Sequence, residues 1–243
     1  MKKTVAFCLI LCALLALKPA FASPGEMINS IVLDPFWGHV LLGFLIIFFL
    51  PFVVHSFIRE KLAEKRARAD LYFMTKYSPV FDWLKIQERA KACFLRIHSD
   101  CWEKEDLSSA SEWMTTWYWQ NQQLVRLKKW KEEDFVNMCD IKRIYHIKPL
   151  LFVHRNQGMG HEHSMVVIAI EAKMKNCLQV RSTGKVVEGS KRYKKVKTVW
   201  SFTLECGVWK VSDIEEDIMS IEYAKLVSDL PKIESTVASD LGV

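Results

Sequence analysis

A run of 23 residues without Asp, Glu, Lys or Arg, from Phe36 to Ile58, constrains this chain more than any other feature. As an α-helix the run would be about 34 Å long, enough to cross the ~30 Å hydrocarbon core of a bilayer. Its centre, Phe44 to Leu50, is apolar on every face, which is not typical of a helix at the surface of a water-soluble domain. The run therefore predicts a transmembrane helix, with a kink expected at Pro51.

A shorter apolar segment stands at the start of the chain. Lys2 and Lys3 precede thirteen apolar residues, Val5 to Leu17, and Ala20-Phe21-Ala22 follows them. A basic start, a short apolar core and small residues at positions −3 and −1 are typical of a secretory signal peptide. We expect residues 1–22 to be cleaved off, with an uncleaved first span as the alternative.

The charges on the two sides of the long run differ. Residues 23–35 contain only two charged residues, Glu26 and Asp34. We expect them to form a short extracytoplasmic segment. Basic residues follow the run at once, and the positive-inside rule then places the C-terminal part of the chain in the cytoplasm. Residues 59–78 predict a basic juxtamembrane helix that either lies on anionic lipid or is simply solvated. The lipid-contact candidates are Arg59, Lys61, Lys65, Arg66 and Arg68.

Charge and cysteine content exclude several classes of protein. The net charge of +6 falls to +3 without residues 1–22, and residues 69–243 carry only +2. The basic excess is therefore gathered at the predicted membrane surface, and we expect no nucleic-acid partner. The cysteines after residue 22 contain no CxxC pair, which argues against a disulfide framework or a zinc site. We expect free thiols at Cys93, Cys101, Cys139, Cys177 and Cys206.

The periodicity changes from helical to strand-like along the cytoplasmic part. After a break at Ser78-Pro79, apolar spacing predicts helices from Val80 to Leu95 and from Asp106 to Lys128, the second with Trp113 and Trp117 on one face. Alternating apolar and polar residues then predict strands. The predicted strands cover 140–153 with a bend at Pro149, 164–175, 197–205 and 208–214, with a tight turn at Cys206-Gly207 and a closing helix over 222–230. Helices followed by antiparallel strands indicate an α+β fold.

Several short motifs occur in a characteristic order between residues 79 and 230. They are Glu88-Arg89-Ala90, Trp113-Met114, Lys142, Arg181 to Lys185, Thr198 to Phe202 and Gly207 to Val211. In this order they resemble the Tim-forty-four-like domain, which is found in the membrane-docked subunit of the mitochondrial import motor and in bacterial membrane proteins. The resemblance implies a cone of the nuclear-transport-factor-2-like type, in which N-terminal helices pack on a curved antiparallel sheet around an apolar pocket.

The resemblance also implies a non-catalytic protein that attaches other proteins to a membrane. Because the chain has no Arg-rich transit peptide and has a predicted span, it fits a bacterial inner-membrane protein better than a mitochondrial one. The expected pocket-lining residues are Trp113, Trp117, Ile168, Trp200, Phe202 and Trp209.

A cluster of basic residues near the end of the predicted sheet is a second candidate contact surface. Lysines on an exposed strand edge often serve only to keep it soluble, and docking of headgroups, RNA or an acidic partner is the functional alternative. The partner-docking candidates are Lys191, Arg192, Lys194, Lys195 and Lys197.

We expect no metal, cofactor or catalytic residue. His154, His161, Glu162 and His163 are close in sequence but lack the HExxH spacing of helical zinc sites. An enzyme would need a carboxylate and a tyrosine together in the pocket, for which the candidates are Glu171, Tyr118 and Tyr145.

The predicted function is a membrane scaffold or adaptor whose cytoplasmic domain, residues 79–230, binds a protein partner, anionic lipid or both. Residues 231–243 form a C-terminal tail. A component of a secretion or translocation apparatus with a cone-type domain is the main alternative, and a pocket enzyme is a weaker one. The partner's identity, the pathway and homo-oligomerisation are left open by the sequence.

Overall fold

The computed structural model describes residues 35–106, 110–155, 160–217, 219–227, 230–234 and 237. The predicted signal peptide (1–22), nearly all of the segment 23–35 and most of the tail 231–243 lie outside these residues and stay predictions. The chain divides into two units, residues 1–55 and 56–243, and each is described by itself.

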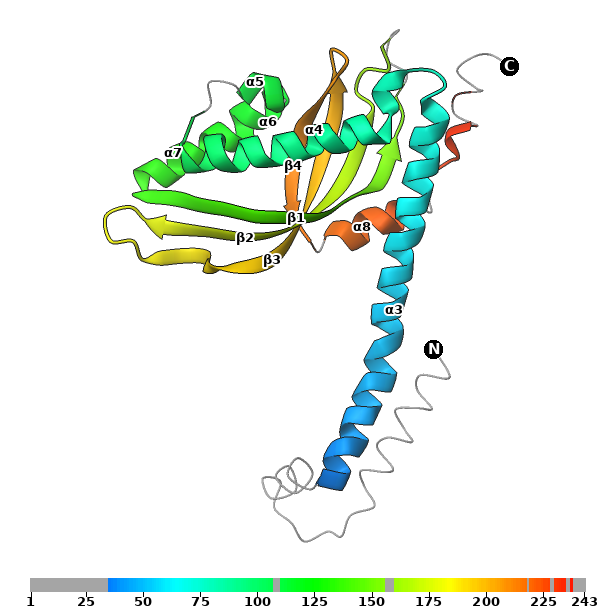
Figure 1. Ribbon diagram of the computed structural model, residues 1–243, viewed down its shortest axis with the longest axis vertical. Coiled ribbons are helices and arrows are strands. Elements are labelled where there is room, and N and C mark those ends of the chain that lie inside the picture. The colour runs from blue at the N-terminus through cyan, green and yellow to red at the C-terminus, as the bar shows by residue number, and fades with distance from the viewer. Residues whose placement is uncertain are drawn as a thin grey trace. The chain divides into compact units, whose positions relative to one another are not determined.

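Helix α3, Pro35–Met74, covers the predicted span and the basic segment after it (Figure 1). Within the first unit most of the described large apolar side chains between Leu41 and Val54 are 44% to 64% exposed, and Phe44 is half-buried. Among the described residues, no helix is long and apolar enough to cross a membrane. The side chains of residues 36–40, 42, 52, 53 and 56 lie outside the described ones, so the span stays a prediction.

In the second unit, the end of α3 leads into a layer of short helices. Ser78 begins the 3-10 turn η1, Pro79–Phe81, and the Asp82 carboxylate then accepts the Leu84 N–H at 3.0 Å, which starts helix α4. The layer consists of α4 (Trp83–Arg96), η2 (Ile97–Glu103), α5 (Ala110–Trp113), α6 (Thr116–Tyr118), η3 (Trp119–Gln123) and α7 (Leu124–Glu132).

The single helix predicted over residues 106–128 is wrong. Thr115 has an extended backbone (φ −64°, ψ 148°), and its hydroxyl accepts the Tyr118 N–H to start α6. Its own N–H donates to the Val211 carbonyl at 2.9 Å. Pairing with a distant strand therefore replaces helical hydrogen bonds here, and Trp113 and Trp117 fall in separate helices instead of on one face.

Four antiparallel strands follow in the order β1-β2-β3-β4, and helix α8, Met219–Leu226, comes after them. The strands are β1 (Phe135–Val153), β2 (Met165–Val180), β3 (Val186–Glu205) and β4 (Val208–Glu216). The tight turn predicted at Cys206-Gly207 is confirmed, with φ values of 52° and 72°. A register shift at Pro149/Leu151 lies where the bend was expected, and shifts in the other pairs add to the bending of the long strands. The α+β fold is confirmed, and its arrangement is consistent with a cone.

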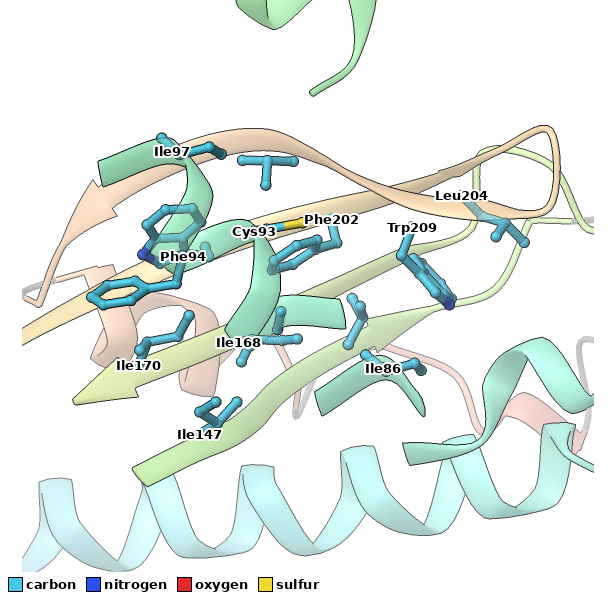
Figure 2. Packing of buried hydrophobic residues seen from close by; sticks show 14 of the residues in the cluster. Ile86, Cys93, Phe94, Ile97, Ile147, Ile168, Ile170, Phe202, Leu204 and Trp209 are labelled. Carbon is cyan, nitrogen blue, oxygen red and sulfur yellow. The ribbon is translucent and has the colours of Figure 1, made fainter. Parts of the chain in front are cut away.

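Helices cover both faces of the sheet, so the second unit has two apolar cores (Figure 1). In the larger core, Ile168, Ile170 and Phe202 of the strands face Phe94 and Ile97 of the helical layer (Figure 2). In the smaller core, α3 at Ala63 and helix α8 pack on the other face of the sheet, whereas Leu71 and Met74 at the end of α3 belong to the larger core. The smaller core contains Ala63, Leu150, Leu151, Val167, Ala169, Val199, Ala224 and Val227.

Candidate functional site

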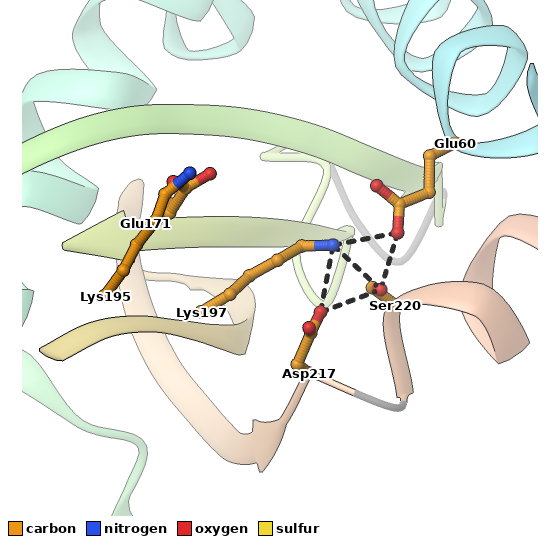
Figure 3. A network of polar contacts seen from close by, with 6 residues as sticks. All are labelled: Glu60, Glu171, Lys195, Lys197, Asp217 and Ser220. Carbon is orange, nitrogen blue, oxygen red and sulfur yellow. Dashed lines mark hydrogen bonds and ion pairs between the residues drawn. The ribbon is translucent and has the colours of Figure 1, made fainter. Parts of the chain in front are cut away.

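A polar network joins α3 to the sheet and to α8. Lys197 Nζ on β3 lies 2.8 Å from Glu60 Oε1, 2.9 Å from Asp217 Oδ1 and 3.1 Å from Ser220 Oγ (Figure 3). The Ser220 hydroxyl donates to Glu60 Oε1 at 2.8 Å. Burial lowers the pKa of Lys197, but its contacts with Glu60 and Asp217 outweigh burial, so the pKa is raised overall.

The predicted docking residues therefore separate into two groups. Lys197 is only 23% exposed and is held in this network, and Lys195 pairs with Glu171. Lys191 donates to the Gly184 carbonyl at 2.8 Å but remains exposed, as do Arg192 and Lys194. A docking partner would thus meet free cations mainly at 191–194.

These basic residues lie on a strand with one open edge. β4 pairs with β3 only from Thr198 to Glu205. Along 186–197, no other described strand pairs with β3 on the side away from β2. Unpaired N–H and C=O groups on such an edge can accept an added strand, although lysines disfavour pairing with another basic edge.

Three of the five predicted lipid-contact residues make contacts within the chain, and those of Arg66 and Arg68 are shorter than that of Lys61. Arg66 donates to the main-chain carbonyls of Leu230 (2.7 Å) and Pro231 (3.0 Å), and also to that of Val227. Arg68 pairs with Glu64 at 3.1 Å and lies over the Trp83 ring. Lipid contact at these positions would have to compete with such bonds. Lys61 lies 3.8 Å from Glu64 and is largely exposed, Lys65 is exposed, and Arg59 is half-buried.

The six predicted pocket-lining residues have different surroundings. Ile168, Trp200, Phe202 and Trp209 are buried in the larger core and help to fill it. Trp117 is 61% exposed, which is a correction to its predicted place in a pocket. Trp113 packs at the edge of the core.

Motif residues that are distant in sequence meet around Trp113. The Arg89 guanidinium lies 4.2 Å from the Trp113 ring centroid. The same group donates to the Trp209 carbonyl at 3.0 Å and to the Glu112 carbonyl at 2.6 Å. Arg89 thereby links helices α4 and α5 to strand β4.

The helical layer and the strands enclose a half-open cavity of about 400 Å³. Trp102 and Trp130 line it, together with His98, which is 2% exposed. Burial lowers the pKa of His98 to about 3, so its ring is neutral. Neither His98 ring nitrogen nor Asn137 Nδ2 has a partner among the described residues. The cavity can therefore offer hydrogen bonds to a small polar molecule, but only if these shielded atoms become accessible.

His154, His161 and Glu162, near the β1–β2 connection, make contacts within the fold. His154 Nε2 and His161 Nδ1 are 3.0 Å apart. The Glu162 carboxylate accepts the N–H groups of Cys206 (2.9 Å) and Gly207 (3.3 Å), which caps the β3–β4 turn. Among the described residues, no group of three or more His, Cys, Asp or Glu side chains could hold a metal ion.

The three residues considered for catalysis are not brought together. Tyr118 is buried in the larger core. Glu171 and Tyr145 are both neighbours of Lys195, on the side of the sheet that faces α3. The described part of the chain thus offers no shared pocket for this carboxylate and the two tyrosines.

Sequence reasoning missed a basic surface on the sheet, hereafter the basic sheet face. It consists of Lys142, Arg143 and Lys148 on β1, Lys173 and Lys175 on β2, and Lys195 on β3. On β2 these lysines alternate with Ala172 and Met174, which point into the larger core. The alternation of Glu171, Lys173 and Lys175 was the sequence signal for a charged face on this strand. The surface as a whole forms only when β1, β2 and β3 pair and bring their basic side chains to the same face.

Comparisons with known proteins place few limits on this chain. No family model matches the sequence, and no curated protein matches it. Among solved structures, the chain is similar to the intermembrane space region of the chloroplast protein ARC6, with 10% sequence identity and a TM-score of 0.40. The likeness covers 56% of this chain and 95% of that one. At this TM-score it supports no inference about function.

Proposed function

We propose that this protein is a non-catalytic scaffold of the bacterial inner membrane, anchored by residues 36–58, with its large domain in the cytoplasm. One observation carries the proposal. Helix α3 is uninterrupted from an apolar stretch with exposed side chains into a stretch whose Ala63, Ala67 and Leu71 are buried against the domain. One helix thus serves as anchor and as part of the folded domain.

The surroundings of this helix add support. Arg66 holds the segment after α8, and Glu60 holds β3, so the helix that carries the anchor is tied both to the sheet and to the segment that follows α8. The basic residues after Ile58 favour a cytoplasmic domain. The resemblance to Tim-forty-four-like domains is in keeping with an attachment role.

The open edge of β3 is the proposed protein-binding surface. Along 186–197 no other described strand pairs with the outer side of β3, although the Arg192 N–H donates to Ser190 Oγ, and the side chains of Lys191, Arg192 and Lys194 are exposed there. An extended acidic segment of a partner could add a strand there, with main-chain hydrogen bonds supplying affinity and charge supplying selectivity.

Three measurements test the proposal. The full chain should stay with membranes in alkaline carbonate, and a C-terminal reporter should be active in the cytoplasm; a periplasmic reporter would favour the secretion-apparatus alternative. Crosslinking in membranes should then recover a discrete partner. Recovery should be lost in K191E/R192E/K194E and kept in K128E/K129E/K131E, which reverses exposed lysines of α7. Equal loss in both variants, or no partner at all, would contradict the scaffold role.

A further inference from the structure

The basic sheet face begins beside the end of the predicted anchor. Phe57, which is 62% exposed, lies one residue before the end of the apolar run. A cleft of about 150 Å³ lies between α3 and the sheet. Phe57, Glu60 and Lys61 line one side of it, and Lys148 and Glu171 line the other. The anchor's end and the basic sheet face are therefore adjoining parts of one surface.

The charge on this face is largely uncompensated. Its two carboxylates are already paired: Asp140 lies 3.5 Å from Lys175 Nζ, and Glu171 pairs with Lys195. No carboxylate among the described residues pairs with the remaining cations. These are Lys142, Arg143, Lys148 and Lys173. Since residues 69–243 carry a net charge of only +2, this face concentrates positive charge well beyond the domain's average.

Two tyrosines lie among these cations. The Tyr193 ring centroid is 4.4 Å from Lys175 Nζ and 5.5 Å from Lys142 Nζ, and its hydroxyl donates to Asp140. The Tyr145 ring centroid is 5.5 Å from the Arg143 guanidinium. Both rings are more than a third exposed. Amphipathic rings beside basic side chains are favoured at the headgroup level of a bilayer.

We propose that the basic sheet face lies on the anionic headgroups of the membrane that holds the anchor. The proposal rests on the proposed function, because only an anchored Phe57 brings this face to headgroup level. Because the face is basic, its charge complements that of anionic lipid headgroups. Because it adjoins the apolar run, a membrane fits it better than a soluble acidic partner does. Attraction is electrostatic and short-ranged, so it should weaken in high salt while the anchor does not.

The test uses the full chain in vesicles of phosphatidylcholine alone or with phosphatidylglycerol, each containing a trace of lipid with a photoactivatable headgroup. Attachment sites are mapped by mass spectrometry. We expect attachments on the peptides around 142–148, 173–175 and 193–195 in the anionic vesicles. They should fall about tenfold or more in phosphatidylcholine, in 0.5 M salt, and in the variant K142E/R143E/K173E.

The matched control is K128E/K129E/K131E, which should keep the attachments, and thermal unfolding should confirm that both variants fold. Attachments that persist in K142E/R143E/K173E, or that are confined to the ends of the anchor in anionic vesicles, would overturn the proposal while leaving the anchor intact. Failure of the chain to float with either kind of vesicle would instead overturn the proposed membrane anchorage.

Discussion

Glu60 of α3 and Lys197 of β3 form an ion pair with 2.8 Å between Oε1 and Nζ, although 137 residues separate them in the chain. Both side chains are about three-quarters buried. The pair therefore links the helix that carries the predicted anchor to the centre of the sheet, and it is shared with Asp217 and Ser220.

Replacing one partner of this pair should cost measurable stability. We expect Glu60→Gln to lower the free energy of unfolding by about 1–2 kcal/mol, because Lys197 loses a charged acceptor in a partly dry site. The control is Glu222→Gln, whose partner Lys225 and own carboxylate are both about half exposed. That change should cost less than about 0.5 kcal/mol in denaturant unfolding. Equal effects would show that the network contributes nothing beyond a surface pair.

The buried neutral ring of His98 should make stability depend on pH. Its pKa is about 3 in the fold and ~6.5 when unfolded, so below pH 6.5 the unfolded state binds more protons and stability falls as pH falls. From pH 6.5 to 5 the loss should be about 2 kcal/mol. Unfolding curves for wild type, His98→Phe and His98→Gln check this. In both variants the free energy of unfolding should lose this part of its dependence on pH. An unchanged dependence would mean that other titratable groups cause it.

Gly189 should tolerate no side chain. Its φ is +81°, and an added Cβ would lie 2.2 Å from the Asn176 carbonyl oxygen on the neighbouring strand. Gly207 also has a positive φ, +72°, but an added Cβ there would meet nothing within 4 Å. We expect Gly207→Ala to cost about 1 kcal/mol and Gly189→Ala clearly more, since the strand pair must move apart. A thermal unfolding midpoint that falls equally in the two variants would refute the close approach.

Two tryptophans that were both predicted to line a pocket should respond differently to truncation. Trp200 is completely buried, and Trp200→Ala should cost about 3–5 kcal/mol or prevent folding. Trp117 is 61% exposed, and Trp117→Ala should change stability by less than about 1 kcal/mol. Equilibrium unfolding of the two variants gives the comparison; a large loss for Trp117→Ala would mean that a partner or a second copy covers it.

Local patterns predicted much of the fold. Alternation along Val166, Ile168 and Ile170 correctly indicated strand β2, and Cys206-Gly207 indicated the turn between β3 and β4. The strand ends were less accurate, since β3 begins at Val186 and not at Lys197. The lysine-rich start of β3 has little apolar alternation of its own, and pairing with β2 holds it in extended form.

The surfaces were harder to predict than the strands. Lys197 had the same sequence signal as Lys194, yet one is held in a network and the other is exposed. Arg66 had the same signal as Lys65, yet it binds carbonyls more than 160 residues away. Burial of a given side chain depends on which distant segment covers it, and composition and spacing carry no information on that.

By itself, the sequence determined the long apolar run, the order of helices before strands, and the tight turn, because each depends on neighbours within a few residues. Only the tertiary structure decided that Thr115 breaks a helix to pair with Val211, and that Lys142, Lys173 and Lys195 share one face. The physical reason is strand register: a shift of one residue moves every side chain to the opposite face, and register is set by contacts between distant segments.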